Sequence, residues 1–327
     1  MSAALAYWQV GESVSLREAF GRALLHAAAE REDFVLFDAD IAGGTGAKPF
    51  AEKFPSRVMQ FGIAEQNMMA AAGGCADTGL IPVVSTFAAF GMMRAHEQFR
   101  TAIAYPKRNV KLFCSHLGLD TGPDGATAQM LEDIAVARSI PNIAIVVPAD
   151  ANEFMKAFAA IMDHRGPVYA RIGRSPAPVI CDAQHRFAIG KATRLREGAD
   201  VTIIGTGVMV ARALDAAASL AASGIAARVI NLSTIKPLDA DEIRAAARET
   251  GAILTAEDHN VHGGMGSAVA EFVVEHCPVP MKIIGVADRF GKSGEPAELA
   301  RLYGLTSERI AAEARALLTR KTCANAA

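Results

Sequence analysis

Short runs of apolar and β-branched residues alternate with helix-length amphipathic segments along most of the chain. Up to about residue 172 the pattern predicts six strands, at Phe34–Phe37, Val58–Phe61, Ile81–Ser85, Val110–Cys114, Ile143–Val147 and Val168–Ile172. Helical patterns lie near 64–78, 88–104, 130–139 and 151–163. Ser15 and Glu18 have the spacing of a capping box, which predicts where the first helix starts. Such alternation is typical of a parallel sheet covered by helices.

A second unit of the same kind follows. Residues 175–190 begin with Ser-Pro-Ala-Pro, which cannot continue a helix, and they are interpreted as a linker. Further strands are predicted at Val201–Ile204, Ala227–Ile230, Ala252–Ala256 and Lys282–Val286, again with helices between them. The sequence therefore predicts an α/β fold of two consecutive domains with mainly parallel sheets, over residues 11–178 and 190–320.

The composition argues against several classes of function. Hydrophobic residues make up 51% of the 327 residues and the formal net charge is −2, so the chain lacks the basic face that holds nucleic acid. No apolar stretch is long enough to cross a bilayer and no signal pattern is found, so a cytoplasmic protein without membrane contact is expected. The five cysteines are scattered without metal-ligand or redox spacing, and no metal site is predicted in this chain.

Residues 61–68 (FGIAEQNM) carry the first candidate chemistry. A strand end turns at Gly62 and enters a helix, which places Glu65 in the first helical turn at the carboxyl edge of a parallel sheet. Ligands of α/β proteins bind at this edge. Taken alone, Glu65 could equally serve only to complement the helix dipole.

Three further segments follow predicted strands. In residues 85–93 (STFAAFGMM), Phe87 and Phe90 share one helical face, which by itself is also typical of a core stripe. Residues 115–129 form a long Gly-rich loop, and such loops are often functional, although a lone loop His is usually just solvated. Residues 169–174 (YARIGR) end a strand with two arginines, which suit a phosphate but could be a solvated pair.

Taken together, these segments closely resemble the transketolase family of thiamine diphosphate enzymes. In that family the carboxylate at the position of Glu65 hydrogen-bonds a ring nitrogen of the cofactor's aminopyrimidine, and aromatics at Phe87 and Phe90 stack on the pyrimidine. Met93 stands where the family usually has a third aromatic, and a thioether can still pack against a ring edge. The resemblance implies that the cofactor-binding residues are Asp40, Ile63, Glu65, Phe87, Phe90 and Met93.

The resemblance also assigns the loop and the arginines. His116 corresponds to the family's contact to the sugar phosphate and Asp124 to a contact with a substrate hydroxyl, with Glu65 and His116 as catalytic residues. The implied substrate-binding residues are Arg17, His116, Asp124, Arg171 and Arg174. Ala128 occupies the position of a second family histidine, which bears on substrate range but not on cofactor chemistry.

The resemblance covers about residues 11–318 and corresponds to the last two of the family's three domains. The chain has no Gly-Asp-Gly sequence, which in the family helps to hold magnesium and the cofactor diphosphate. A partner is therefore implied: an N-terminal transketolase subunit with the diphosphate-binding domain and the magnesium ligands. This chain would also pair with itself within a heterotetramer.

The leading functional expectation is transfer of a two-carbon ketol unit between phosphorylated ketose and aldose sugars, as in pentose phosphate metabolism, by the assembled enzyme. Alternatives are the beta subunit of a 2-oxoacid dehydrogenase first component, a 1-deoxyxylulose-5-phosphate synthase-like enzyme, and a non-catalytic scaffold subunit. The loop from His116 to Gln129 and Arg171 argue against the dehydrogenase, since they suit sugar phosphates. Retention of the whole residue set argues against the scaffold.

Overall fold

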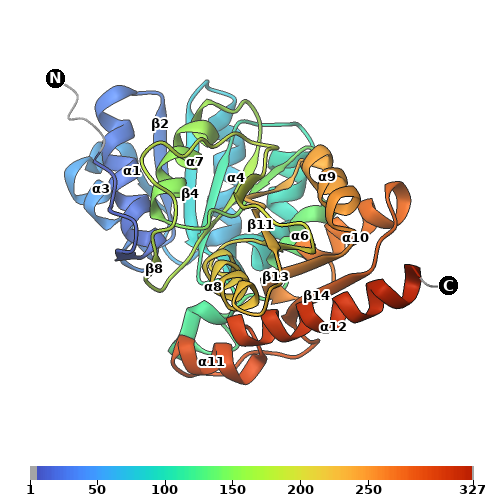
Figure 1. Ribbon diagram of the computed structural model, residues 1–327. Helices are drawn as coiled ribbons and strands as arrows, with labels where there is room; N and C mark the ends of the chain where they lie inside the picture. Colours follow the sequence, from blue (N-terminus) through green and yellow to red (C-terminus); the bar gives the residue numbers. More distant parts are fainter. Residues whose placement is uncertain (1–5, 326–327) are drawn as a thin grey trace.

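The computed structural model describes residues 6–325, which form two α/β units side by side (Figure 1). The larger sheet has seven strands in the spatial order β12, β6, β7, β5, β4, β2, β3, all parallel except β12. Its strands are β2 (Phe34–Asp38), β3 (Val58–Gln60), β4 (Ile81–Phe87), β5 (Lys111–Ser115), β6 (Ala144–Val146), β7 (Val168–Ile172) and β12 (Thr234–Lys236). The six strands predicted for this unit are confirmed within a few residues at each end.

Helices cover both faces of this sheet. One face carries α1 (Leu16–Glu30), α3 (Lys48–Lys53) and α7 (Ala151–Asp163), and the other carries α4 (Glu65–Ala76), η2 (Ala89–Arg94), α5 (His96–Gln98), η3 (Phe99–Ala104) and α6 (Asp133–Ser139). Shorter elements are β1 (Ser13–Val14), α2 (Ala42–Thr45), η1 (Pro55–Arg57), η4 (Leu119–Asp124) and β8 (Ala177–Pro178). The hydroxyl of Ser15 caps α1 by accepting from the amide of Glu18, as the sequence predicts.

The helix expected over 88–104 is one place where the structure differs. It is divided into two π-helical segments, η2 and η3, with the short α5 between them. Bonds of the wider π spacing run from the amide of Ala95 to the carbonyl of Phe90 and from Tyr105 to Arg100. Such widened turns are rare and are frequent at functional sites.

The second unit contains a five-stranded sheet in the order β14, β13, β10, β11, β9, with β9 antiparallel at one edge. Its strands are β9 (Thr193–Arg196), β10 (Val201–Gly205), β11 (Ala227–Asn231), β13 (Ile253–Asn260) and β14 (Met281–Val286). Its helices are α8 (Met209–Ala221), α9 (Ala240–Thr250), α10 (Met265–His276), α11 (Pro296–Tyr303) and α12 (Ser307–Asn325). The long α12 lies with α8 on one face of this sheet, and α9 and α10 cover the other (Figure 1).

The two units share structure at their junction. Strand β12 belongs by sequence to the second unit but pairs with β6 and so extends the first sheet. A single hydrophobic cluster continues from α4 and α6 of the first unit to Ile235, Ile243 and Val269 of the second. The observed fold is thus two α/β units with mostly parallel sheets, as predicted. Among the described residues, no helix is both long and apolar enough to cross a membrane.

Candidate active site

Five neighbouring strands of the larger sheet bring the predicted site residues to one edge. In spatial order these strands are β7, β5, β4, β2 and β3, all parallel, so their carboxyl ends lie together. The candidate residues follow or end these strands, or begin the helix after them: Asp40 after β2, Glu65 after β3, Phe87 at the end of β4, His116 after β5, and Arg174 after β7. The topology therefore gathers residues that are far apart in sequence.

Glu65 begins α4 and is only 3% exposed. The preceding chain turns at Gly62, whose φ of 63° is a left-handed conformation that glycine adopts readily. One carboxylate oxygen, Oε2, accepts a hydrogen bond from Nη1 of Arg94 at 2.9 Å. The other oxygen, Oε1, accepts no hydrogen bond from any residue between 6 and 325, so Glu65 retains an acceptor for a ligand.

Two aromatic rings lie beside this carboxylate. Phe87 and Phe90 stack with ring centroids 5.6 Å apart and an angle of 15° between their planes. The ring of Phe87 also stacks on His116 at 3.5 Å. Gly44 allows this arrangement, because a Cβ there would lie 2.8 Å from Cε1 of Phe87. The structure therefore brings together the rings that the sequence analysis selected.

The other predicted cofactor residues lie more openly. Ile63 is 79% exposed and Met93 is 49% exposed. Asp40 is exposed with a φ of 60°, and its amide donates to Oε1 of Gln60 at 2.8 Å. These three residues are thus available to a ligand or to another chain.

Sequence reasoning missed Arg94. Its Nη1 bonds Glu65, and its Cζ lies 4.6 Å from the centroid of the Phe90 ring. Arg94 follows Phe90 by four residues, which is the spacing of side chains on one helical face. That spacing is the signal that could have identified it.

His116 is buried, with a φ of 57°. Its Nε2 lies 3.1 Å from Oδ2 of Asp124, and its Nδ1 lies 2.9 Å from Oγ of Ser115. Burial is the main cause that lowers the pKa of His116 to about 4, so the ring is neutral at pH 7. The neighbouring carboxylate requires the proton on Nε2, which makes Nδ1 the acceptor for the Ser115 hydroxyl.

Two arginines line the same loop. Nη2 of Arg174 lies 3.7 Å from Oδ1 of Asp124, and the Nε of Arg17 donates to the carbonyl oxygen of Arg174 at 3.2 Å. Nη1 of Arg17 donates to the carbonyl oxygen of Gly44. Burial, followed by the charge of Arg174, lowers the pKa of Arg17. Arg17, His116, Asp124 and Arg174 therefore form one cluster.

Arg171 is not part of that cluster. Its side chain is 4% exposed, and its Nε and Nη2 donate to the two carboxylate oxygens of Asp133 at 2.7 and 2.6 Å. Nη1 and Nη2 also donate to the carbonyl oxygen of Asp258. Since all three side-chain nitrogens are engaged within the chain, the geometry gives Arg171 a structural position rather than that of a phosphate ligand.

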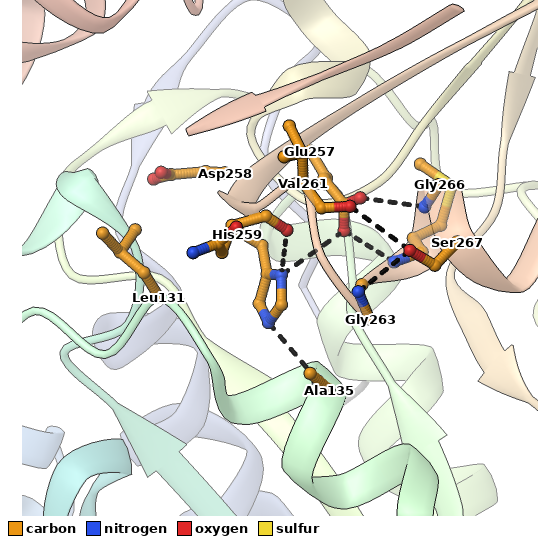
Figure 2. Close-up of polar contacts among 12 residues, drawn as sticks. Leu131, Ala135, Glu257, Asp258, His259, Val261, Gly263, Gly266 and Ser267 are labelled. Atoms are coloured by element: carbon orange, nitrogen blue, oxygen red, sulfur yellow. Dashed lines mark hydrogen bonds and ion pairs between the residues drawn. The ribbon is translucent and has the colours of Figure 1, made fainter. Parts of the chain in front are cut away.

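The second unit supports the loop of residues 116–129 through Asp258, which sequence reasoning also missed. Its carboxylate accepts from the amides of Leu119 at 2.9 Å and Asp120 at 3.0 Å, while Gly118 passes too close to allow a side chain. Figure 2 shows the segment around it. Glu257 accepts from the amides of Met265 and Gly266 at the start of α10.

His259 completes this buried segment. Its Nε2 accepts from the amide of Ala135 at 3.4 Å, so the proton lies on Nδ1, which donates to the carbonyl oxygen of Asn260 at 2.6 Å (Figure 2). Burial lowers the pKa of His259 to about 4. Within residues 6–325 no group of three or more His, Cys, Asp or Glu residues could hold a metal ion.

Comparisons with known proteins agree with this arrangement. The family description "Transketolase, pyrimidine binding domain" matches residues 12–178, and "Transketolase, C-terminal domain" matches residues 190–310. The 6-deoxy-6-sulfo-D-fructose transketolase subunit SqwH of Clostridium sp. (strain MSTE9) is 40% identical over 94% of this chain and 95% of its own length. One of the subunits of the apulose-4-phosphate transketolase of Phocaeicola vulgatus is 38% identical over 91% of this chain and 95% of its own.

A solved structure described as a split gene transketolase, inactive beta4 tetramer, superimposes with a TM-score of 0.88 and 44% identity, covering 94% of this chain and 99% of its own. The two family descriptions match the two units described above, and the relatives and the solved structure cover both units. The chain therefore belongs to the transketolase family, and it is similar throughout to subunits of split transketolases.

Proposed function

We propose that this chain is the pyrimidine-binding subunit of a heteromeric transketolase, which transfers a two-carbon ketol unit between phosphorylated ketose and aldose sugars with thiamine diphosphate. The observation that carries the proposal is the buried carboxylate of Glu65, with one open oxygen, beside the stacked rings of Phe87 and Phe90. Relatives named for a sulfo-sugar and for apulose 4-phosphate support sugar substrates as the general class.

The residues fit the aminopyrimidine of the cofactor. Oε1 of Glu65 can accept a hydrogen bond from a heteroaromatic ring, and Phe87 and Phe90 offer aromatic surface for stacking. Ile63, Met93 and Asp40 would contact the cofactor or the chain that holds its other end. Bound thiamine diphosphate supplies the carbon nucleophile that accepts the ketol unit. Glu65 shares a proton with the pyrimidine ring and so controls its tautomer.

The cluster around His116 suits the sugar. Nε2–H of His116 is held by Asp124 and can be shared with a substrate oxygen, because the neutral ring is a donor at this atom. Asp124 accepts from a substrate hydroxyl. Arg17 and Arg174 supply positive charge for the phosphate, since Nη2 of Arg17 makes no hydrogen bond to any described residue.

The proposed partner is an N-terminal transketolase subunit. It would hold the cofactor diphosphate and magnesium; among this chain's described residues, no group of three or more His, Cys, Asp or Glu side chains could hold a metal ion. The exposed Ile63 and Met93 lie where such a subunit would cover the cofactor. Two copies of each subunit would form the active heterotetramer in the cytoplasm, and the chain alone would transfer no ketol unit.

Glu65→Gln tests the proposal in the assembled complex. Glutamine keeps the size and a hydrogen-bonding group but cannot share the proton. Exchange of the cofactor's thiazolium C–H for deuterium, followed by quenched-flow NMR, should slow by about 10²–10⁴-fold. The control Glu97→Gln changes an exposed carboxylate of the neighbouring α5 and should exchange like the wild type. Wild-type exchange in Glu65→Gln, with the cofactor bound, would remove Glu65 from the catalytic role.

A further inference from the structure

The side chain of Arg94 contacts both groups that the proposed function assigns to the cofactor's aminopyrimidine, the Glu65 carboxylate and the ring of Phe90. It donates to Oε2 of Glu65 at 2.9 Å, and it lies over the ring of Phe90, with Cζ 4.6 Å from the centroid. A guanidinium is planar, carries several N–H donors and stacks on aromatic faces. An aminopyrimidine is also planar, carries an N–H donor and stacks. The two groups therefore compete for the face of Phe90 and for the place beside the Glu65 carboxylate, although Arg94 bonds Oε2 and the pyrimidine would bond Oε1.

We propose that Arg94 is an internal placeholder for the pyrimidine: it partners the Glu65 carboxylate and covers the face of Phe90, and it must leave that position when the ring binds. The inference rests on the proposed function, because it concerns the same pocket. It adds Arg94 as the residue that a binding pyrimidine ring must displace. Arg94 acts here as a positioning residue, not as a catalytic one.

Burial explains why Glu65 needs such a partner. The Glu65 side chain is 3% exposed, and a buried carboxylate without a charged or hydrogen-bonding partner is strongly destabilising. Among residues 6–325, Arg94 is the one side chain that bonds this carboxylate. A bound pyrimidine offers an alternative partner, so the ion pair can be exchanged without leaving Glu65 unsatisfied.

The arginine is placed so that it can move. Its own side chain is 48% exposed, in contrast to the carboxylate that it meets, so it can turn into solvent without crossing packed residues. Arg94 is the last residue of the π-helical η2, next to the irregular α5 and η3. Widened helical turns of this kind recur at functional sites.

Thiamine binding to the purified full-length chain tests the inference, because thiamine carries the aminopyrimidine without the diphosphate that a partner would hold. Removing a competitor that fills the pocket most of the time should lower the dissociation constant of thiamine by about 10-fold in Arg94→Met. Arg94→Lys keeps the charge but not the planar fork, so its affinity should lie between those of wild type and Arg94→Met. Isothermal titration calorimetry measures all three.

Arg100→Met is the matched control. Arg100 is exposed in the same helical stretch, and its side chain contacts no described residue through a hydrogen bond or ion pair, so thiamine affinity should equal that of wild type. Thermal unfolding gives a second readout. Without thiamine, Arg94→Met should lower Tm by at least about 2 °C, since Glu65 loses its partner, and saturating thiamine should raise Tm more in Arg94→Met than in wild type.

The outcomes separate the inference from the proposed function. Equal or weaker thiamine binding in Arg94→Met and Arg94→Lys would overturn the placeholder while leaving the pyrimidine pocket on this chain intact. Absence of thiamine binding in every variant would overturn the placeholder alone, because the proposed function is tested by Glu65→Gln in the assembled complex. Tighter binding in Arg94→Met with unchanged binding in Arg100→Met would support the placeholder.

Discussion

Two groups of charged side chains lie near the carboxyl ends of the strands of the same sheet. They differ in how many of their hydrogen-bonding atoms have a partner within the chain. At the junction of the two units, Arg171 and Asp133 are 4% and 0% exposed and use their hydrogen-bonding groups on each other, with Tyr169 as a further donor. In the pocket, Glu65 is equally buried but has one open oxygen, and its partner Arg94 is 48% exposed.

The difference indicates which of the two arginine–acid pairs can bind a ligand. A saturated, buried pair has no donor or acceptor left for a ligand, and opening it would strand a charge. A buried carboxylate with a loose partner can exchange that partner for a ligand at little cost. Residue type alone does not separate the two groups, since both consist of an arginine and an acid at a strand or helix end.

The largest effect is expected from breaking the saturated pair. Arg171→Met leaves Asp133 buried without its charged partner, and the free energy of unfolding should fall by about 3–5 kcal/mol. Urea denaturation followed by circular dichroism measures this. Arg174→Met is the control, because its side chain is 25% exposed and its carboxylate contact is 3.7 Å, so the change should stay below about 1 kcal/mol.

A different result for Arg171→Met would contradict this distinction between the two arginine–acid pairs. If Arg171→Met kept wild-type stability and the assembled enzyme lost affinity only for phosphorylated substrates, Arg171 would belong with the pocket. The sequence-based assignment to the phosphate would then stand, and the buried pair in the structure would have no structural role.

A second test measures how the free energy of unfolding depends on pH through Glu257. Burial raises the pKa of Glu257 from its ordinary value of 4.5 to about 7, despite its two amide donors. Between these values the folded chain keeps a proton that the unfolded chain releases. The stabilisation from this group is therefore complete below about pH 4.5 and is lost as the pH rises through about 7.

Glu257→Gln should abolish this contribution. Relative to the variant, the wild type should lose about 2 kcal/mol of unfolding free energy between pH 5 and 7.5. His259 contributes the opposite trend, because its pKa is lowered to about 4 and its stabilisation is lost as the pH falls from 6.5. His259 is present in both proteins, but its Nδ1 lies 3.9 Å from Oε2 of Glu257, so the difference reports Glu257 together with its effect on this histidine. Glu271→Gln, at an exposed residue of α10, should show no such slope, and parallel curves for Glu257→Gln and wild type would contradict the raised pKa.

The sequence predicted the strands well because their apolar runs are fully buried. Those at Val168–Ile172 and Ile81–Ser85 are mostly apolar and buried along their whole length, which is the pattern of a central parallel strand. The sequence analysis missed two strands. Strand β9 (Thr193–Arg196) is mostly polar and lies at a sheet edge. Strand β12 (Thr234–Lys236) is three residues long and forms by pairing with the other unit. Pairing of that kind leaves no local pattern.

For the site, the sequence selected residue types but not their partners. It placed Glu65, Phe87, Phe90 and His116 at one edge, and the structure brings them together. It could not foresee that Arg171 would be enclosed, because Asp133 lies 38 residues away and meets it only when α6 packs on the sheet. The support from the second unit, such as the contact of Asp258 with the amides of Leu119 and Asp120, is likewise a property of packing and not of any local pattern.

The smallest effect is expected at the substrate end of the pocket, where Arg17 is half-buried beside Arg174. If Arg17 binds the substrate phosphate, Arg17→Gln removes one charge-assisted contact. The Michaelis constant for a phosphorylated substrate should then rise by an amount worth about 1.5–3 kcal/mol, while unphosphorylated acceptors should be converted as by wild type. Steady-state assays of the assembled complex with both kinds of acceptor measure the difference.

Arg22→Gln provides the control for this last comparison, since Arg22 lies on the same helix α1 but stacks over Trp8, with Cζ 4.5 Å from the ring. Its loss should leave both Michaelis constants unchanged. An equal rise for phosphorylated and unphosphorylated acceptors in Arg17→Gln would show that Arg17 acts by holding the carbonyl oxygens of Gly44 and Arg174 in place. Arg17 would then join Arg171 among the arginines whose hydrogen bonds are used within the fold, and the phosphate would depend on Arg174 and His116.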